Sequence, residues 1–295
     1  MKLGIALPNA VPGAPGDAVT TWARRAEECG FDSVAVIDRV VYDSVDPLVA
    51  LAMAAAVTSR VELVTNVLIA PQHRTALLAK QAASIDRASG GRLTLGVGVG
   101  VRADDFAACE IPFRSRGARL DRQLDELRGI WNGEWGIGPA PARPGGPRLL
   151  IGGDAALAGP RAARHGGGWT MMVGTPDQFA AGVDTVHRAW REAGRPGTPR
   201  TMAVFYAALG EAVPNSPPAR SATTTPGSAP TSPAGSPAPP PPTRTPSPAA
   251  SRSSPPPAPT RSSSPPARPR SPSSSGSPAS RCALPPPSDH HPLSS

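Results

Sequence analysis

Three glycine-rich segments follow short apolar runs and have the composition of a ligand-binding edge. They are Gly96–Arg102, Gly152-Gly153-Asp154 and Val173-Gly174. Glycine has no side chain, so it lets a flat ligand or a phosphate approach the backbone closely. Glycine is also enriched in turns. The composition alone therefore leaves a binding role and a purely structural role open.

Three arginines are candidate contacts for an anionic cofactor or substrate. Arg39 and Arg102 follow predicted strand ends, and Arg114 lies in the loop beyond the fourth strand. A guanidinium binds a carboxylate or phosphate through two parallel hydrogen bonds. Solvated loop cations are equally compatible with these positions. The functional interpretation predicts that at least one of the three binds an anion.

Other familiar site patterns are missing from the sequence. No pair of histidines has metal-ligand spacing, so no metal is expected, and no Gly-x-Ser-x-Gly motif or Ser/His/Asp arrangement assigns a catalytic residue. The segment 98–103 (GVGVRA) matches the G-x-G-x-x-G/A dinucleotide pattern. It lies in the fourth strand–helix unit, however, and no acidic strand end follows about 20 residues later. A nicotinamide-dependent dehydrogenase is therefore the weaker alternative.

Short apolar runs alternate with amphipathic segments over residues 1–210. The predicted strands are Lys2–Pro8, Ser33–Asp38, Val61–Ala70, Arg92–Gly100, Leu149–Gly152, Trp169–Val173 and Thr201–Ala208. The predicted helices are Asp17–Cys29, 46–58, Thr75–Ala88, Gly117–Trp131, Arg161–Arg164 and 175–193. This alternation predicts an α/β fold with a parallel sheet covered by helices. The carboxyl ends of the strands, and with them the glycine-rich segments, should then lie at one edge.

Two architectures are compatible with this predicted sheet. A doubly wound sheet usually has about five or six strands, whereas a (β/α)₈ TIM-type barrel has eight in about 250 residues. Seven units in residues 1–210 favour a barrel that is truncated after the seventh strand. The first and seventh strands would then have open edges. Marginal stability, impaired activity and a homodimer paired edge to edge are the expected consequences.

Residues 211–295 have a different composition. They hold 26 of the 40 prolines, contain no Phe, Trp or Tyr, and carry +5 of the net charge of +8. Such a segment cannot bury enough apolar surface to offset chain entropy, which predicts a disordered tail rich in Pro, Ser, Ala and Arg. Two origins remain open: a proline-rich interaction tail on a non-catalytic barrel, or a frameshift in a GC-rich gene near Glu211.

The charge and the hydropathy of the chain exclude several classes. Residues 1–210 carry only +3, which does not indicate a nucleic-acid-binding core. The apolar run at the start is cut by Pro8, so it is too short for a signal peptide. No apolar stretch approaches the roughly 18 residues of a membrane span. The sequence predicts a soluble, cytoplasmic protein without a nucleic-acid or membrane partner.

Residues 1–210 resemble the luciferase-like flavin-dependent oxidoreductases. The motifs that carry the resemblance are 30–34 (GFDSV), 46–52 (DPLVALA), 64–71 (VTNVLIAP), 78–86 (LAKQAASID), 89–98 (SGGRLTLGVG), 151–153 (IGG) and 165–169 (HGGGW). The resemblance implies a (β/α)₈ barrel with FMN or the 8-hydroxy-5-deazaflavin coenzyme at its carboxyl end. It also implies an oxidoreductase or monooxygenase with hydride or oxygen chemistry on a small organic substrate, with NAD(P)H or a flavin reductase as candidate partners.

The resemblance also gives the cofactor a position. Many members hold a non-proline cis peptide bond behind the ring, at the position of Asn66–Val67 in this sequence. By the same resemblance, Gly98 and Gly100 lie along the ring and the ribityl chain. These residues are the expected contacts of the flat part of the cofactor.

The phosphate of the cofactor is expected at the start of the helix after the fifth strand. There, Gly153, Asp154 and Ala155 would receive it on backbone N–H groups, and Gly168 and Trp169 would line the same end.

The chain also departs from the family. The region 38–40 (DRV) stands where bacterial luciferases have a catalytic His, Ala155 and Ala156 lack a hydroxyl, Asp154 adds a negative charge, and Pro160 is expected to interrupt the helix. These departures predict weak FMN affinity or another ligand.

Overall fold

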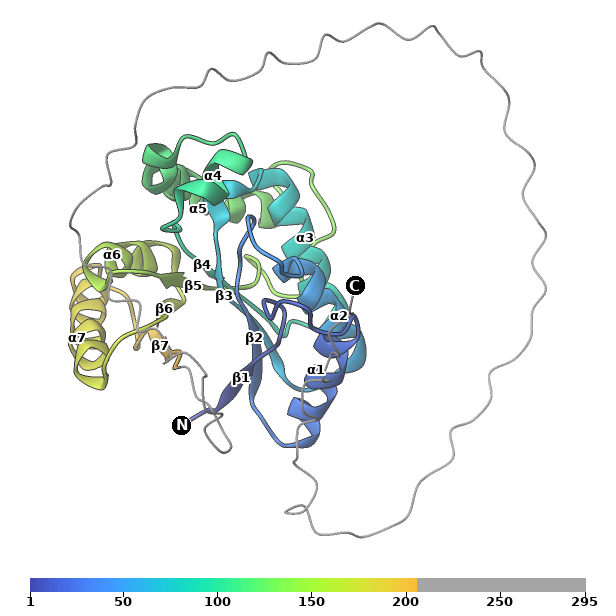
Figure 1. Cartoon of the computed structure of the whole chain (residues 1–295). Helices are drawn as coiled ribbons and strands as arrows, with labels where there is room; N and C mark the ends of the chain where they lie inside the picture. Colours follow the sequence, from blue (N-terminus) through green and yellow to red (C-terminus); the bar gives the residue numbers. More distant parts are fainter. Residues whose placement is uncertain (206–295) are drawn as a thin grey trace, which may run out of the picture. The chain divides into compact units, whose positions relative to one another are not determined.

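The computed structural model of the protein describes residues 1–205, in which seven parallel strands follow one another in sequence order (Figure 1). The strands are β1 (Gly4–Ala6), β2 (Ser33–Val36), β3 (Glu62–Leu68), β4 (Leu93–Val97), β5 (Arg148–Gly152), β6 (Gly168–Met171) and β7 (Arg200–Ala203). A doubly wound sheet reverses its strand order part-way. The unbroken order β1 to β7 therefore excludes that alternative. The prediction of a TIM-type barrel truncated after the seventh strand is confirmed for the described residues.

A helix follows each of the first six strands, and several helices begin where the sequence predicts. The helices are α1 (Ala18–Glu28), α2 (Pro47–Val57), α3 (Thr75–Ala88), α4 (Ala103–Ala108), α5 (Arg116–Trp131), α6 (Ala155–His165) and α7 (Pro176–Glu192), with short 3₁₀ turns η1 (Ala70–Gln72) and η2 (Phe113–Ser115). Asp46 caps α2 by accepting the N–H groups of Leu48 and Val49, each at 2.9 Å. α4, η1 and η2 were not predicted.

The expectation that Pro160 interrupts the helix after β5 is wrong. α6 continues from Ala155 through Pro160 to His165. A proline removes one backbone hydrogen bond inside a helix, yet α6 continues through Pro160 and packs closely against α7. A Cβ placed on Gly159 would lie 3.3 Å from the Cβ of Ala189, so the two helices approach closely at that point.

Glu62 and Arg200 show how far the sheet is rolled. They stand at the starts of β3 and β7, yet the Arg200 guanidinium donates to both carboxylate oxygens of Glu62, at 2.5 and 2.8 Å. Thr94 on β4 donates to the same carboxylate, and Arg148 on β5 lies 3.6 Å from it. The interior at the amino end of the strands is therefore filled by a bridge between opposite walls. We call the other end of the barrel, formed by the carboxyl ends of the strands, the mouth.

The charges of this bridge set the protonation of its acid. Burial raises the pKa of the Glu62 carboxyl, but the hydrogen bonds from Arg200 and Thr94 and the charges of Arg200 and Arg148 outweigh burial. The pKa of Glu62 therefore lies below its ordinary value, and the group is an anion at neutral pH.

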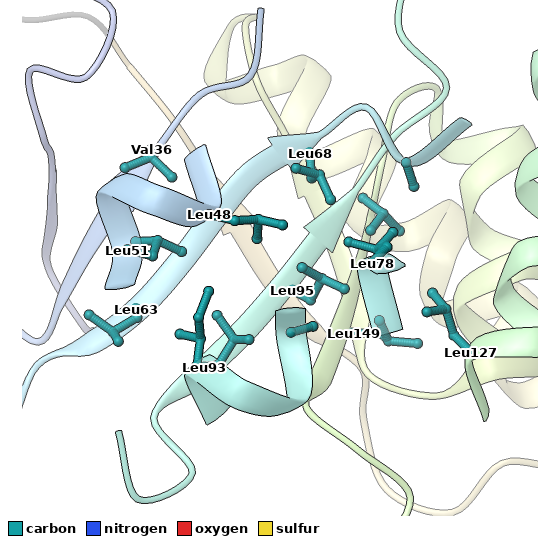
Figure 2. Close-up of a cluster of buried hydrophobic side chains, with 14 of the residues drawn as sticks. Val36, Leu48, Leu51, Leu63, Leu68, Leu78, Leu93, Leu95, Leu127 and Leu149 are labelled. Carbon is teal, nitrogen blue, oxygen red and sulfur yellow. The ribbon is translucent and has the colours of Figure 1, made fainter. Parts of the chain in front are cut away.

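The main core lies between the sheet and the covering helices. Figure 2 shows Leu63 and Leu68 of β3, Leu93 and Leu95 of β4, and Leu48 and Leu51 of α2 within one cluster of buried side chains. Burying a leucine side chain stabilises a fold by about 1.5–3 kcal/mol. This core holds the central strands in register and thereby fixes the positions of the loops at the mouth.

The boundary of the barrel domain at residue 210 and the predicted disordered tail 211–295 lie outside the described residues, as does the end of the predicted seventh strand after Phe205. Within residues 1–205, β1 and β7 are the outermost strands of the sheet. No helix in this part of the chain is long and apolar enough to cross a membrane.

Candidate functional site

Glycines replace side chains on one wall of the barrel near the mouth. Gly96, Gly98 and Gly152 follow Thr94 and Arg148 at alternate positions, and alternate strand residues share a face. Such interior positions in TIM barrels are normally filled by branched side chains. Here the Val67 side chain takes that space. A Cβ on Gly98 would lie 2.8 Å from Cγ2 of Val67, and a Cβ on Gly152 would lie 2.7 Å from its Cγ1. The three glycines and Val67 form one layer, which we call the glycine floor.

Asn66 lies beside the glycine floor in the interior of the barrel. The Asn66–Val67 peptide bond is cis, as the resemblance predicts. The side chain of Asn66 is 2% exposed, and its Oδ1 accepts a hydrogen bond from the Thr170 hydroxyl of β6 at 2.9 Å. Its amide nitrogen lies 3.5 Å from Sδ of Met202 on β7. Asn66 therefore links three strands just below the mouth.

Gly100 continues the same wall above Gly98. Its φ is +69°, and an added Cβ would lie 2.7 Å from Cγ2 of Ile69 and 3.2 Å from the Phe106 ring. Both the backbone conformation and the close contacts require glycine here. The requirement comes from the packing of the protein itself.

The start of α6 is open on the side of Gly153 but already capped. Gly153 has φ +117°, and a Cβ built on it would have no atom within 4 Å, so its backbone faces open space. Asp154 accepts the N–H of Ala156 on its side chain at 2.8 Å. A phosphate at this helix start would use the same class of N–H groups. The carboxylate of Asp154 therefore occupies a donor that such a phosphate would bind.

Gly168 and Trp169 support the mouth through contacts with β7 and from the outer side of the sheet. A Cβ on Gly168 would lie 1.9 Å from the carbonyl oxygen of Arg200, so close pairing with β7 requires this glycine. The Trp169 ring is 2% exposed and stacks on Phe179 of α7, with 5.7 Å between ring centroids. Its indole N–H donates to the carbonyl of Gly153 at 2.9 Å. Trp169 therefore positions Gly153 from the outer side of the sheet.

Arg39 is bound to the carboxylate of Asp105. Its Nε donates to Asp105 Oδ2 at 2.8 Å, and the other oxygen of Asp105 accepts the N–H groups of Val40 at 3.1 Å and of Val41 at 2.7 Å. Asp105 is 2% exposed and lies on α4. The loop after β2 is thus fastened to the helix after β4.

The other two candidate arginines differ from each other. Arg102 forms a two-point contact with Asp104, at 3.1 and 2.7 Å, and the pKa of the Asp104 carboxyl falls to about 2, chiefly because of the hydrogen bond from Arg102. Arg114 lies exposed in η2. The structure therefore brings Arg39 and Arg102 together around one acidic pair and leaves Arg114 apart from it.

Two polar residues at strand ends, to which the sequence assigned no role, help to build the mouth. Asn9 donates to the carbonyls of Ile37 and Val45, at 2.8 and 3.1 Å, which ties the loop after β1 to the loop after β2. Asp38 accepts the N–H of Ile69 at 2.8 Å. Both side chains are buried. A polar residue directly after an apolar strand was the available signal, but that signal does not distinguish a structural from a catalytic role.

A thiol and an imidazole lie near these acids. Cys109 is a half-buried free thiol, and burial and the charges of Asp38 and Asp105 raise its pKa. Nε2 of His73 lies 3.7 Å from Asp38. Within residues 1–205, no group of three His, Cys, Asp or Glu side chains could hold a metal ion.

The family model described as luciferase-like monooxygenase matches residues 1–213. The chain belongs to the luciferase-like monooxygenase family. The predicted resemblance is thereby confirmed.

Two sequence relatives of this luciferase-like chain show how far the likeness extends. An uncharacterized protein of Mycobacterium tuberculosis is 31% identical over 208 residues, which cover 59% of this chain and 71% of that relative. The F420-dependent glucose-6-phosphate dehydrogenase of Kribbella flavida is 36% identical over 140 residues, or 44% of this chain and 42% of that enzyme. Both matches span only part of each relative.

Solved structures of luciferase-like enzymes share the fold. The monooxygenase RslO1 of Streptomyces bottropensis superposes with a TM-score of 0.63 at 27% identity, covering 68% of this chain and 69% of that chain. The oxygenating constituent of 3,6-diketocamphane monooxygenase of Pseudomonas putida, solved in complex with FMN, gives 0.61 at 18% identity, covering 69% and 66%. At 18% identity, the similarity to the 3,6-diketocamphane monooxygenase structure supports the fold alone.

Proposed function

We propose that the protein is a flavin- or deazaflavin-dependent oxidoreductase of the monooxygenase type that acts on a small organic substrate. Family membership supports an oxidoreductase. One of its structural neighbours holds FMN, and one of its sequence relatives depends on F420, a deazaflavin coenzyme. The observation that carries the proposal is the glycine floor, because it leaves one wall of the mouth without side chains apart from Val67.

The residues present fit a flat cofactor at the ring end. The ring would lie against Val67 and along Gly98 and Gly100. Fit at the phosphate end is partial, because Asp154 already bonds the N–H of Ala156. The open backbone of Gly153 and the start of α6 would still receive the phosphate. This difference between the two ends favours a cofactor whose binding depends mainly on its ring.

The cofactor, when bound, supplies hydride or oxygen chemistry, and this chain supplies position and a dry surrounding. Asn66 is fixed by Thr170 and presents no loose polar group to the site. Trp169 holds the Gly153 carbonyl, and Asp105 holds the loop of Arg39 beside the mouth. These contacts fix the mouth before any ligand arrives, which reduces the entropy lost on binding.

The test is a spectral titration of the purified full chain with FMN and, separately, with F420. We expect saturable binding of one of them and loss of that binding in Gly98→Val. The control is Gly117→Val on α5, where the nearest atom to an added Cβ is 3.7 Å away. Thermal melting of both variants is needed, because a side chain at Gly98 also displaces Val67.

Two outcomes would contradict the proposal. One is a folded parent protein that binds neither cofactor, which is the behaviour of the alternative, a non-catalytic barrel. The other is a folded Gly98→Val variant that binds as tightly as the parent, which would remove the ring from the glycine floor.

A further inference from the structure

Four of the loops at the mouth of the barrel carry exposed apolar side chains. Most of the large apolar side chains that are exposed within residues 1–205 lie in segments that follow strand ends. Six of them form what we call the apolar collar: Val11, Val40, Val41, Tyr42, Val101 and Val173, which are between 44% and 86% exposed. They come from the loops after β1, β2, β4 and β6. Exposed apolar patches on a soluble protein commonly mark a binding surface.

The loops that carry the collar on the β1, β2 and β4 side are fixed to one another by hydrogen bonds. The N–H of Val45 donates to the carbonyl of Asn9 at 2.7 Å, and the N–H of Gly13 lies 3.3 Å from a carboxylate oxygen of Asp43. Asp105 holds the N–H groups of Val40 and Val41. These side chains are therefore held at the surface by a preformed framework, which keeps them from collapsing into the core.

The two arginines in these loops are both paired with carboxylates of the same loops. Arg39 pairs with Asp105 at 2.8 Å and lies 3.8 Å from Asp104, and Arg102 pairs with Asp104 at 2.7 Å. The Arg39 guanidinium also lies 5.3 Å from the centroid of the Tyr42 ring. Both arginines are therefore engaged by carboxylates, and the loop after β2 also carries the carboxylates of Asp38 and Asp43. Binding a phosphate or carboxylate here would require breaking an existing ion pair.

From these two observations we infer that the apolar collar selects a neutral, apolar organic substrate. The inference rests on the proposed function, because that function places the reacting ring at the same mouth. An apolar ligand gains about 25 cal/mol for each Å² of apolar surface removed from water. An anionic substrate such as a sugar phosphate gains nothing from the valines and meets a paired Arg39 and Arg102.

The experiment uses the full chain saturated with whichever cofactor binds, and the neutral fluorescent dye Nile red as the probe. We expect saturable dye binding that 1-decanol displaces at least tenfold better than decanoate, which has the same chain length and a negative charge. Val41→Asp should weaken dye binding at least tenfold. Val49→Asp is the matched control, because Val49 is a valine of similar exposure (53% against 47%) on α2. It should leave the affinity unchanged.

Several results would overturn the inference. These are no saturable dye binding, equal displacement by decanol and decanoate, or equal effects of Val41→Asp and Val49→Asp. A parent protein that is a dimer in gel filtration, and that Val41→Asp converts to a monomer, would show that a second copy covers the collar instead. Cofactor titration separates the two proposals. Cofactor binding without selective dye binding overturns the collar alone, whereas a folded protein that binds no cofactor overturns the proposed function and the collar with it.

Discussion

Asp154 offers a direct test of where the cofactor phosphate lies. Its carboxylate accepts the N–H of Ala156 and stands at the start of α6, where the phosphate is proposed to bind. Replacing Asp154 by Asn removes the negative charge. It should keep the helix cap, because Asn and Asp cap helices about equally well. We therefore expect Asp154→Asn to bind FMN more tightly than the parent, with little change in stability.

The size of the effect follows from the geometry of the helix start. A phosphate that bonds the neighbouring N–H groups would lie about 5 Å from the carboxylate, and two unit charges at that distance repel by about 1 kcal/mol in water and about 3 kcal/mol at an effective dielectric constant near 20. Asp154 is exposed, so the lower value applies. A gain of about 1 kcal/mol corresponds to an affinity about fivefold higher.

The assay is fluorescence titration of FMN against the parent, Asp154→Asn and Asp154→Ala at low and at high salt. Asp154→Ala also removes the charge but loses the cap, so it should tighten FMN binding while lowering the melting temperature. The gain should shrink at high salt because ions screen exposed charges. An Asp154→Asn variant with unchanged affinity, or with a gain that salt does not affect, would refute the placement of the phosphate at α6.

Three further predictions concern the framework around the site. Arg200→Met should destabilise the fold by about 3 kcal/mol in urea unfolding because it removes the main cation from the largely buried Glu62 carboxylate. Adding Glu62→Gln should recover part of the loss, and a double variant no better than the single one would contradict this. Burial raises the pKa of Glu27, but backbone N–H groups before β3 lower it from 4.5 to about 2. The stabilisation that these hydrogen bonds give is fully present above pH 4.5 and is lost as the pH falls toward 2. Glu27→Gln should therefore melt below the parent at neutral pH, and the difference between the two melting temperatures should shrink as the pH falls through that range. Gly182→Ala would bring a Cβ within 2.4 Å of the Trp169 ring. It should cost about 1–3 kcal/mol of stability in thermal melts and weaken FMN binding, and an unshifted melting curve would contradict the tight contact.

The elements that could be predicted from sequence are those with local signals. Asp46-Pro47 and Thr175-Pro176 marked the starts of α2 and α7, and the structure shows side-chain caps at both. Glycine-rich segments that follow predicted strands predicted the position of the mouth. These features depend on neighbouring residues, so a single sequence is enough to detect them.

The features that could not be predicted depend on distant residues or on the face of a strand. Asp105 is fixed by Arg39, which is 66 positions away, and its neighbours in sequence give no hint of that contact. Trp169 was expected to line the phosphate end of the cofactor; its ring packs against α7, and its indole N–H bonds the Gly153 carbonyl at that end. Neighbouring strand residues point to opposite faces, so an uncertainty of one position decides which side a ring occupies.

The bridge between Glu62 and Arg200 also has a consequence for the order of folding. Its two residues are 138 positions apart, so the chain must lose the entropy of closing a long loop before the bridge can stabilise the fold. The β3–β4 and β4–β5 pairings close much shorter loops and need no help from β7. During synthesis, the Glu62 carboxylate therefore lacks its main partner until residue 200 has left the ribosome. We expect the bridge to form after the folding transition state, so that Arg200→Met speeds unfolding and leaves the folding rate nearly unchanged.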